Sequence, residues 1–117
     1  MAPGIVQPTE RLKRRPEFLR VASKGRRASV HGLVLQALSR DNDRPARIGF
    51  TVTKKVGNAV IRNRTKRRLR ETARLLLRDA PLHGVDLVLI GRDATRSRPF
   101  AMLMDDLRRA LNKVGVS

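Results

Sequence analysis

The chain has 117 residues, enough for one domain with a single core and too few for two. Its 27 Lys and Arg residues outnumber 10 Asp and Glu residues, and the resulting net charge of +17 favours a polyanionic partner, either nucleic acid or an anionic membrane surface. Cysteine is absent, which excludes a disulfide framework, a thiolate nucleophile and a zinc–thiolate site. No stretch is long and apolar enough for a transmembrane helix or a secretory signal, so we expect a cytoplasmic protein.

The first part of the chain predicts a tail, a helix and three strands. Residues 1–8 contain two prolines and a glycine without apolar periodicity, which is typical of a flexible tail before a single domain that extends to residue 117. Pro16 suits the first turn of a helix that ends at Gly25, with Leu19 and Ala22 as its packing residues. The strands are expected over residues 26–31, 32–39 and 47–53, the last with alternating apolar side chains.

The densest positive charge follows the third of these strands, in residues 54–71. Asn58 is a suitable N-cap for a helix that runs to about Asp79. The helical spacing places Ile61, Thr65, Leu69, Thr72 and Leu76 on one face, and we expect this face to pack on a core. The other faces carry cations four residues apart, such as Arg62, Lys66 and Arg70. Repulsion between like charges at this spacing weakens a helix unless a polyanion binds there. A solvated surface with no partner is the alternative interpretation.

The last part of the chain predicts a buried strand and an amphipathic helix. Residues 85–90 are apolar apart from Asp86, for which we expect an outward position or an arginine partner. Ser97 is expected to cap the final helix, with Pro99 in its first turn and Gly115 at its end. The order helix, strands, helix, strand, helix predicts an α+β fold, a two-layer sandwich.

The run KKVGNAV at residues 54–60, followed by RNR at 62–64, KR at 66–67 and RE at 70–71, resembles the signature of the bacterial ribonuclease P protein subunit. Proteins of this family assist a catalytic RNA that removes the 5′ leader from precursor tRNA. The resemblance implies a sheet of about four strands, three helices and a left-handed βαβ crossover around residues 59–79. The general rule for such crossovers predicts the opposite hand.

The resemblance also implies two RNA-binding surfaces. The residues expected to contact the catalytic RNA are Arg62, Asn63, Arg64, Lys66, Arg67 and Arg70. The leader of the precursor would lie in a cleft lined by Phe18, Lys54 and Lys55. On spacing alone Phe18 is more readily interpreted as a core residue, and the resemblance decides for base stacking. Members of the family often have further aromatic residues where this chain has Ala22 and Gln36, so we expect weaker stacking here.

Two further positions depart from the family pattern. Thr65 and Arg68 stand where an apolar residue is usual, and we expect Arg68 to extend to the edge of the helix–sheet interface. Alternatively, the helix is rotated slightly.

No catalytic set is evident in the sequence. His31 and His83 are isolated, and Asp105 and Asp106 are expected to pair with the arginines that follow them. We therefore predict no catalytic residue, metal ligand or cofactor on this chain. The resemblance implies that the RNA subunit uses Mg²⁺ for catalysis and that the protein binds it as a monomer in a 1:1 complex, away from membranes.

Three alternatives remain on sequence grounds. A general RNA-binding or ribosomal-type protein would have the same composition without selectivity for precursor tRNA. A module that binds a membrane surface or an acidic partner would need an exposed apolar face beside its charges. A nuclease that acts by itself would need the catalytic set that the sequence lacks.

Overall fold

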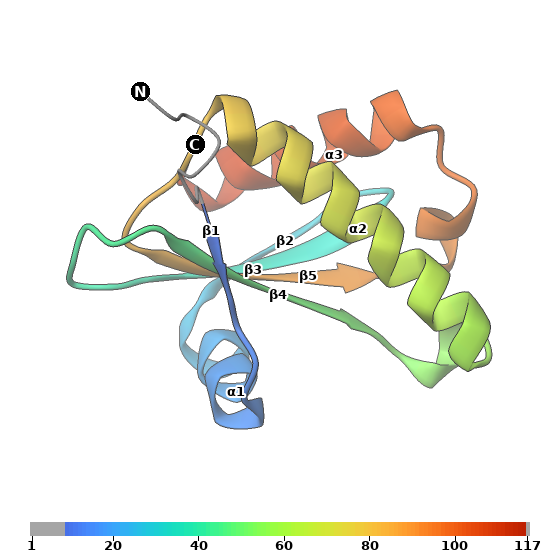
Figure 1. Ribbon diagram of the computed structural model, residues 1–117, viewed down its shortest axis with the longest axis horizontal. Helices are drawn as coiled ribbons and strands as arrows, with labels where there is room; N and C mark the ends of the chain where they lie inside the picture. The colour runs from blue at the N-terminus through green and yellow to red at the C-terminus, as the bar shows by residue number, and fades with distance from the viewer. Residues whose placement is uncertain (1–8, 117) are drawn as a thin grey trace, which may run out of the picture.

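The computed structural model describes residues 9–116 and contains one mixed sheet with helices on both faces (Figure 1). The strands are β1 (Thr9–Arg11), β2 (Arg26–Ser29), β3 (Leu33–Ser39), β4 (Ala46–Val52) and β5 (Val85–Gly91). The helices are α1 (Arg15–Lys24), α2 (Ala59–Asp79) and α3 (Phe100–Val114), with short 3₁₀ turns η2 (Lys54–Val56) and η3 (Asp93–Arg96). Helices α2 and α3 cover one face of the sheet, and α1 packs on the other.

The sheet has the strand order β1-β4-β5-β3-β2, with β5 at its centre. Strands β4 and β5 are parallel and are connected through α2, whereas β3 is antiparallel to both β5 and β2. The predicted α+β class and the three helices are therefore confirmed. The hand of the β4–α2–β5 crossover stays a prediction from the family resemblance.

The sheet has five strands where about four were expected. The additional strand, β1, spans three residues and pairs in parallel with β4 from Ala46 to Ile48. A segment this short has no period that a sequence pattern can reveal. The expected tail at residues 1–8 lies outside the described residues.

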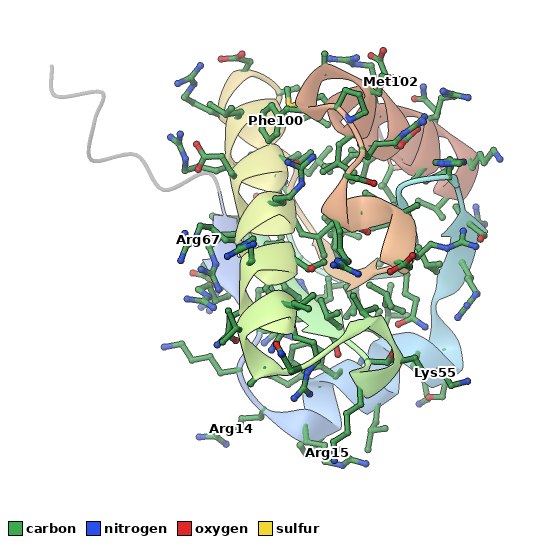
Figure 2. The ribbon with its side chains drawn as sticks, turned by 90° about the vertical axis from the view of Figure 1, so that its right-hand side faces the viewer. Arg14, Arg15, Lys55, Arg67, Phe100 and Met102 are labelled. Atoms are coloured by element: carbon green, nitrogen blue, oxygen red, sulfur yellow. The ribbon has the colours of Figure 1, made fainter. Side chains whose placement is uncertain are left out.

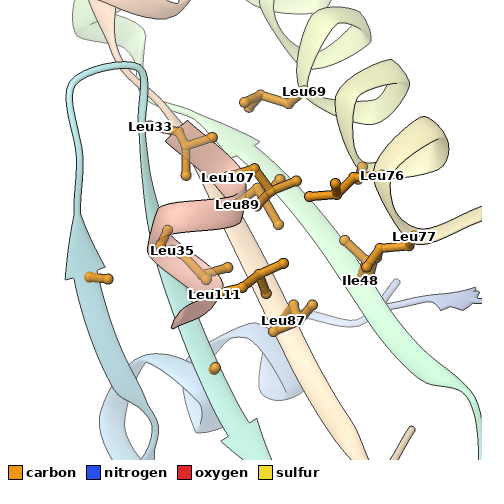
Figure 3. Packing of buried hydrophobic residues seen from close by; sticks show 14 of the residues in the cluster. Leu33, Leu35, Ile48, Leu69, Leu76, Leu77, Leu87, Leu89, Leu107 and Leu111 are labelled. Carbon is orange, nitrogen blue, oxygen red and sulfur yellow. The ribbon is translucent and has the colours of Figure 1, made fainter. Parts of the chain in front are cut away.

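The main core lies between the sheet and the helices α2 and α3 (Figure 3). Leu35, Leu69, Leu89 and Leu107 are each no more than 1% exposed, and they come from β3, α2, β5 and α3. Burying such side chains fully contributes roughly 1.5–3 kcal/mol each relative to exposure. The helix stripes predicted from the sequence therefore pack on the sheet as expected.

Helix α3 ends at the residue predicted from the sequence but begins at a different one. Gly115 ends the helix in the left-handed conformation at φ 77°, as predicted. Ser97 does not cap the helix, which is a correction: the N-cap is Pro99, and α3 begins at Phe100. The chain before it is already coiled by η3, where the N–H of Arg98 bonds the carbonyl of Ala94 at 3.1 Å.

Helix α1 packs through a residue that the sequence analysis passed over. Val21 is 1% exposed and forms a small second cluster with Leu12 and Val88, whereas Leu19 is 53% exposed and Ala22 is also exposed. The expectation that Leu19 and Ala22 pack in the core is therefore wrong. The ten residues of α1 contain two apolar pairs at helical spacing, Phe18 with Val21 and Leu19 with Ala22, and either pair could face the core. Only the tertiary contacts distinguish them.

None of the helices between residues 9 and 116 combines the length and apolarity needed to cross a membrane.

Candidate nucleic-acid interface

The signature stretch forms the turn η2 and most of α2, with the N-cap predicted from the sequence. The side chain of Asn58 accepts a hydrogen bond from the N–H of Ile61 at 3.0 Å. Of the residues expected to contact the catalytic RNA, four are exposed on α2, namely Asn63, Arg64, Arg67 and Arg70, and the other two, Arg62 and Lys66, are partly buried. Figure 2 shows Arg67 projecting from α2 on the side away from η3. All six come from α2, and we call them together the α2 cationic face; Arg64 lies at its edge on the side of η3, where it lines a pocket with Asp93 and Arg96.

The positive charge of the α2 cationic face is not neutralised within the described chain. Ion pairs among residues 9–116 use other arginines, namely Arg40, Arg47, Arg74, Arg78, Arg96, Arg98, Arg108 and Arg109. None of these ion pairs includes a residue of the α2 cationic face, so its positive charge is available to an external anion.

Arg68 differs from its neighbours because its guanidinium points into the protein. Its Nε donates to the carbonyl of Thr95 at 2.9 Å, and a terminal nitrogen donates to the carbonyl of Arg98. It therefore joins α2 to η3 and to the segment that follows η3. The expected position of Arg68 at the edge of the helix–sheet interface stays a prediction. Thr65 is 1% exposed and donates its hydroxyl to the carbonyl of Ile61 at 2.8 Å, so a polar residue replaces the usual apolar one without an unsatisfied hydroxyl.

On the opposite face of the sheet, a groove of about 460 Å³ lies beside α1. We call it the α1 groove. Its helix side is formed by Lys13, Arg15, Phe18, Leu19 and Ala22. Its sheet side is formed by Gln36, Phe50, Thr51, Val88 and Ile90. The exposed Leu19 and Ala22 are therefore groove residues, and an apolar floor with cations at one rim suits a single-stranded polyanion with bases to stack.

The half-buried ring of Phe18 rests directly on a glycine. A Cβ added to Gly49 of β4 would lie 2.4 Å from Cε2 and Cζ of Phe18, closer than any real contact. Sequence analysis missed this role of Gly49. Its only signal was a glycine inside a strand, which often marks the close approach of another group.

Lys54 and Lys55 are exposed on η2 and are not among the residues that line the α1 groove. They follow the end of β4, beyond Thr51 of the groove floor. Figure 2 shows Lys55 with Arg14 and Arg15 at the lower end of the molecule, where α1 lies. The structure thus brings Phe18 together with Lys13 and Arg15, and places the two predicted lysines farther along the sheet.

A charged network holds the first turn of α1 against the sheet. Arg47 of β4 donates to both carboxylate oxygens of Asp86 at 2.8 and 2.7 Å and to Glu17 of α1 at 2.8 Å. Asp86 is thus paired with an arginine, as expected, and its hydrogen bond raises the pKa of Arg47. The backbone N–H groups of Arg14 and Lys13 bond the Glu17 carboxylate and hold its pKa below the ordinary value. Since Glu17 directly precedes Phe18, this network holds in place the helical turn from which the aromatic ring projects.

The acid pair of α3 has two different roles. Asp105 pairs with Arg108 at 2.7 Å, as expected. Asp106 is 1% exposed and accepts two hydrogen bonds from Arg98 at 2.8 and 3.1 Å, which raise the pKa of Arg98, whereas Arg109 is only within 3.7 Å. The expected pairing of Asp106 with Arg109 is therefore a minor contact, and its main role is to fix the segment after η3.

The histidines and acidic residues of the described chain do not gather into a metal site. His31 and His83 are exposed, as expected. Between residues 9 and 116, no group of three or more His, Asp or Glu side chains could hold a metal ion.

The fold and these two surfaces define a class: a small basic α+β protein that presents a cationic helix on one face of its sheet and an apolar groove on the other. The chain matches the family described as "Ribonuclease P" over residues 6–115. It therefore belongs to the ribonuclease P protein family, which confirms the resemblance seen in the sequence.

Relatives and solved structures agree with this assignment. The chain is 70% identical over 106 residues to the "Ribonuclease P protein component" of Gluconacetobacter diazotrophicus, covering 91% of each chain. It is 54% identical to that of Ruegeria pomeroyi, covering 88% of this chain and 84% of the relative. The ribonuclease P protein of Staphylococcus aureus superposes with a TM-score of 0.75 at 27% identity, covering 91% and 95% of the two chains. The protein from Thermotoga maritima gives 0.72 at 29%, covering 90% and 94%.

Proposed function

We propose that this chain is the protein subunit of a ribonuclease P ribonucleoprotein. It binds the catalytic RNA and the 5′ leader of precursor tRNA and assists the endonucleolytic removal of that leader. The observation that carries the proposal is the placement of the α2 cationic face and the α1 groove on opposite faces of one sheet. Family membership supports the assignment to this reaction.

The α2 cationic face is assigned to the catalytic RNA. Arginine suits phosphates because its planar guanidinium presents a fork of donors, and Asn63 offers an amide for a base edge or a 2′-hydroxyl. Each phosphate neutralised adds about 0.9 to the salt slope of binding for a duplex and about 0.7 for a single strand.

The α1 groove is assigned to the leader. A base stacked on Phe18 would gain roughly 1–3 kcal/mol, and Lys13 and Arg15 at the rim would bind the adjoining phosphates. Lys54 and Lys55 extend this path beyond the groove. Mature tRNA lacks a leader, so these contacts favour the precursor over the product. The protein contributes binding and positioning, and the Mg²⁺ used for cleavage is assigned to the RNA subunit.

The test is cleavage of a precursor tRNA at low Mg²⁺ by the catalytic RNA alone, the protein alone, and both together. We expect efficient cleavage only with both. Phe18→Ala is expected to lower affinity for the precursor but not for mature tRNA, and Arg64→Ala to weaken binding of the catalytic RNA. Cleavage by the protein alone would refute the assignment of catalysis to the RNA. Tight RNA binding without enhanced cleavage would favour a general RNA-binding protein instead.

A further inference from the structure

Helix α2 and the turn η3 enclose a polar pocket of about 370 Å³, which we call the α2–η3 pocket. Figure 2 shows η3 beside α2. The α2 wall of the pocket is formed by Ile61, Arg64, Thr65 and Arg68, and the opposite wall by Asp93, Arg96 and Ser97. Three arginines and one aspartate line it, which leaves a net charge of +2. Of these arginines, only Arg64 was assigned to RNA from the sequence.

The guanidinium of Arg68 is held in a fixed orientation at the pocket. Its Nε donates to the carbonyl of Thr95 at 2.9 Å, and one terminal nitrogen donates to the carbonyl of Arg98. The other terminal nitrogen has no hydrogen-bond partner among residues 9–116 and is not fully covered by protein atoms. Arg68 also takes part in no ion pair of the described chain. A partly buried charge without a counter-ion is costly, and an anion that enters the pocket recovers this cost.

Both walls of the α2–η3 pocket are positioned by buried contacts. Thr95 of η3 is fully buried, and its hydroxyl donates to the carbonyl of Gly32 at 2.5 Å and accepts from the N–H of Arg92 at 2.8 Å. A Cβ added to Gly91 would lie 2.9 Å from Cγ2 of Thr65, so α2 rests directly on the end of β5. The pocket therefore exists before a ligand arrives, which lowers the ordering cost of binding.

The other two arginines of the pocket have free or easily exchanged donors. Arg64 is exposed and is not paired with a carboxylate within residues 9–116. Arg96 pairs with Asp93 at 3.2 Å, through side chains that are 45% and 82% exposed. An exposed pair of this kind contributes little to stability, so Arg96 can exchange its carboxylate for another anion. Guanidinium groups bind phosphate oxygens through paired N–H donors, and the pocket has no aromatic ring on which a base would stack.

We propose that the α2–η3 pocket binds one phosphate of the catalytic RNA, held by Arg68 and Arg96 with Arg64 at the rim. Because Arg64 belongs to both the pocket and the α2 cationic face, an RNA backbone bound along that face reaches the pocket without a break. The RNA contact thus extends from α2 to the segment between β5 and α3. The proposal rests on the assignment of the α2 cationic face to the catalytic RNA.

The test maps the phosphates of the catalytic RNA that the full-length protein requires. Single phosphates are neutralised by ethylation, RNAs that still bind are separated from those that do not, and the modified positions are compared. We expect one phosphate that interferes with wild-type binding to lose its effect in Arg96→Gln, while the other interfering phosphates keep theirs. The same change should weaken binding by about tenfold, the lower end of what a hydrogen bond to a charged group gives. It should also reduce the salt slope by about 0.7–0.9.

Arg108→Gln is the matched control. Arg108 is exposed and pairs with Asp105 three residues before it, as Arg96 pairs with Asp93, but it lies on α3 outside the α2–η3 pocket. This control should leave the interference map unchanged.

An unchanged interference map in Arg96→Gln overturns the inference. If inorganic phosphate, compared with chloride at equal ionic strength, then still raises the melting temperature of wild type more than that of Arg96→Gln, the pocket binds a free anion and not the RNA. If no ethylated phosphate interferes with binding of the wild-type protein, the assignment of the α2 cationic face to the catalytic RNA fails, and the proposed function fails with it.

Discussion

The contact between Phe18 and Gly49 allows a direct test of how the α1 groove is built. Gly49→Ala places a methyl group 2.4 Å from two ring carbons of Phe18 and 3.2 Å from Cβ of Leu12. The ring must leave its seat or the strand must shift, and overpacking of this kind costs about 1–3 kcal/mol. Alanine in a strand is otherwise more favourable than glycine by roughly 0.5–1 kcal/mol because glycine loses more conformational entropy on folding.

A double-mutant cycle separates these two effects. With Phe18→Ala already present, the clash with the ring is absent, and Gly49→Ala should be neutral or stabilising by about 0.5 kcal/mol. In the wild-type background the same change should be destabilising by about 1–2 kcal/mol, so the coupling free energy is about 1.5–2.5 kcal/mol.

Urea unfolding followed by circular dichroism gives the free energies, since the chain has no Trp or Tyr for fluorescence. A coupling below about 0.5 kcal/mol would mean that the two residues act independently. That result would refute the claim that Gly49 seats the ring. Precursor affinity should fall in Gly49→Ala together with stability, because a displaced Phe18 no longer presents its face to the groove.

Two further predictions concern the charged residues that the structure separates by role. Glu17 has a lowered pKa, so its contribution to stability is complete above its ordinary pKa of 4.5 and is lost as the pH falls through the lower folded value. Glu17→Gln should therefore lower the free energy of unfolding more at pH 7 than at pH 3, and equal differences from wild type at both pH values would contradict this. Arg68→Met should lower the free energy of unfolding by about 1–3 kcal/mol because the carbonyls of Thr95 and Arg98 lose a charged donor. The matched change Arg67→Met should leave the free energy of unfolding within about 0.5 kcal/mol of wild type. It should instead reduce the salt slope of RNA binding by about 0.9. Reversed effects at these two positions would show that α2 is rotated relative to the structure.

Sequence reasoning succeeded where the determining interactions are local. Asn58 caps α2 through a bond three residues away, and Gly115 ends α3 through its own backbone conformation. The stripes of α2 and α3 are long enough for the helical period to identify the buried face. In α1, with ten residues, the same reasoning chose Leu19 and Ala22 over Val21 and was wrong.

The features that were missed depend on residues far apart in the sequence. Gly49 seats a ring from α1, and β1 exists because residues 9–11 meet an edge of β4. Asp106 was expected to serve its neighbours on α3, yet its strongest partner is Arg98 in the segment before the helix. No local period or spacing encodes such contacts, because they follow from how the elements are placed around the sheet.

The two proposed RNA surfaces meet at one point, the free part of the β4 edge. β1 pairs with β4 only as far as Ile48, so Phe50 lies beyond the covered portion. Its ring lies 5.9 Å from the guanidinium carbon of Arg70 on the α2 cationic face, and Phe50 also lines the α1 groove. The same five-stranded sheet thus carries both surfaces. Under the proposed function, RNA bound to one face keeps the leader near the other at a high effective concentration, so precursor selectivity needs no conformational change in the protein.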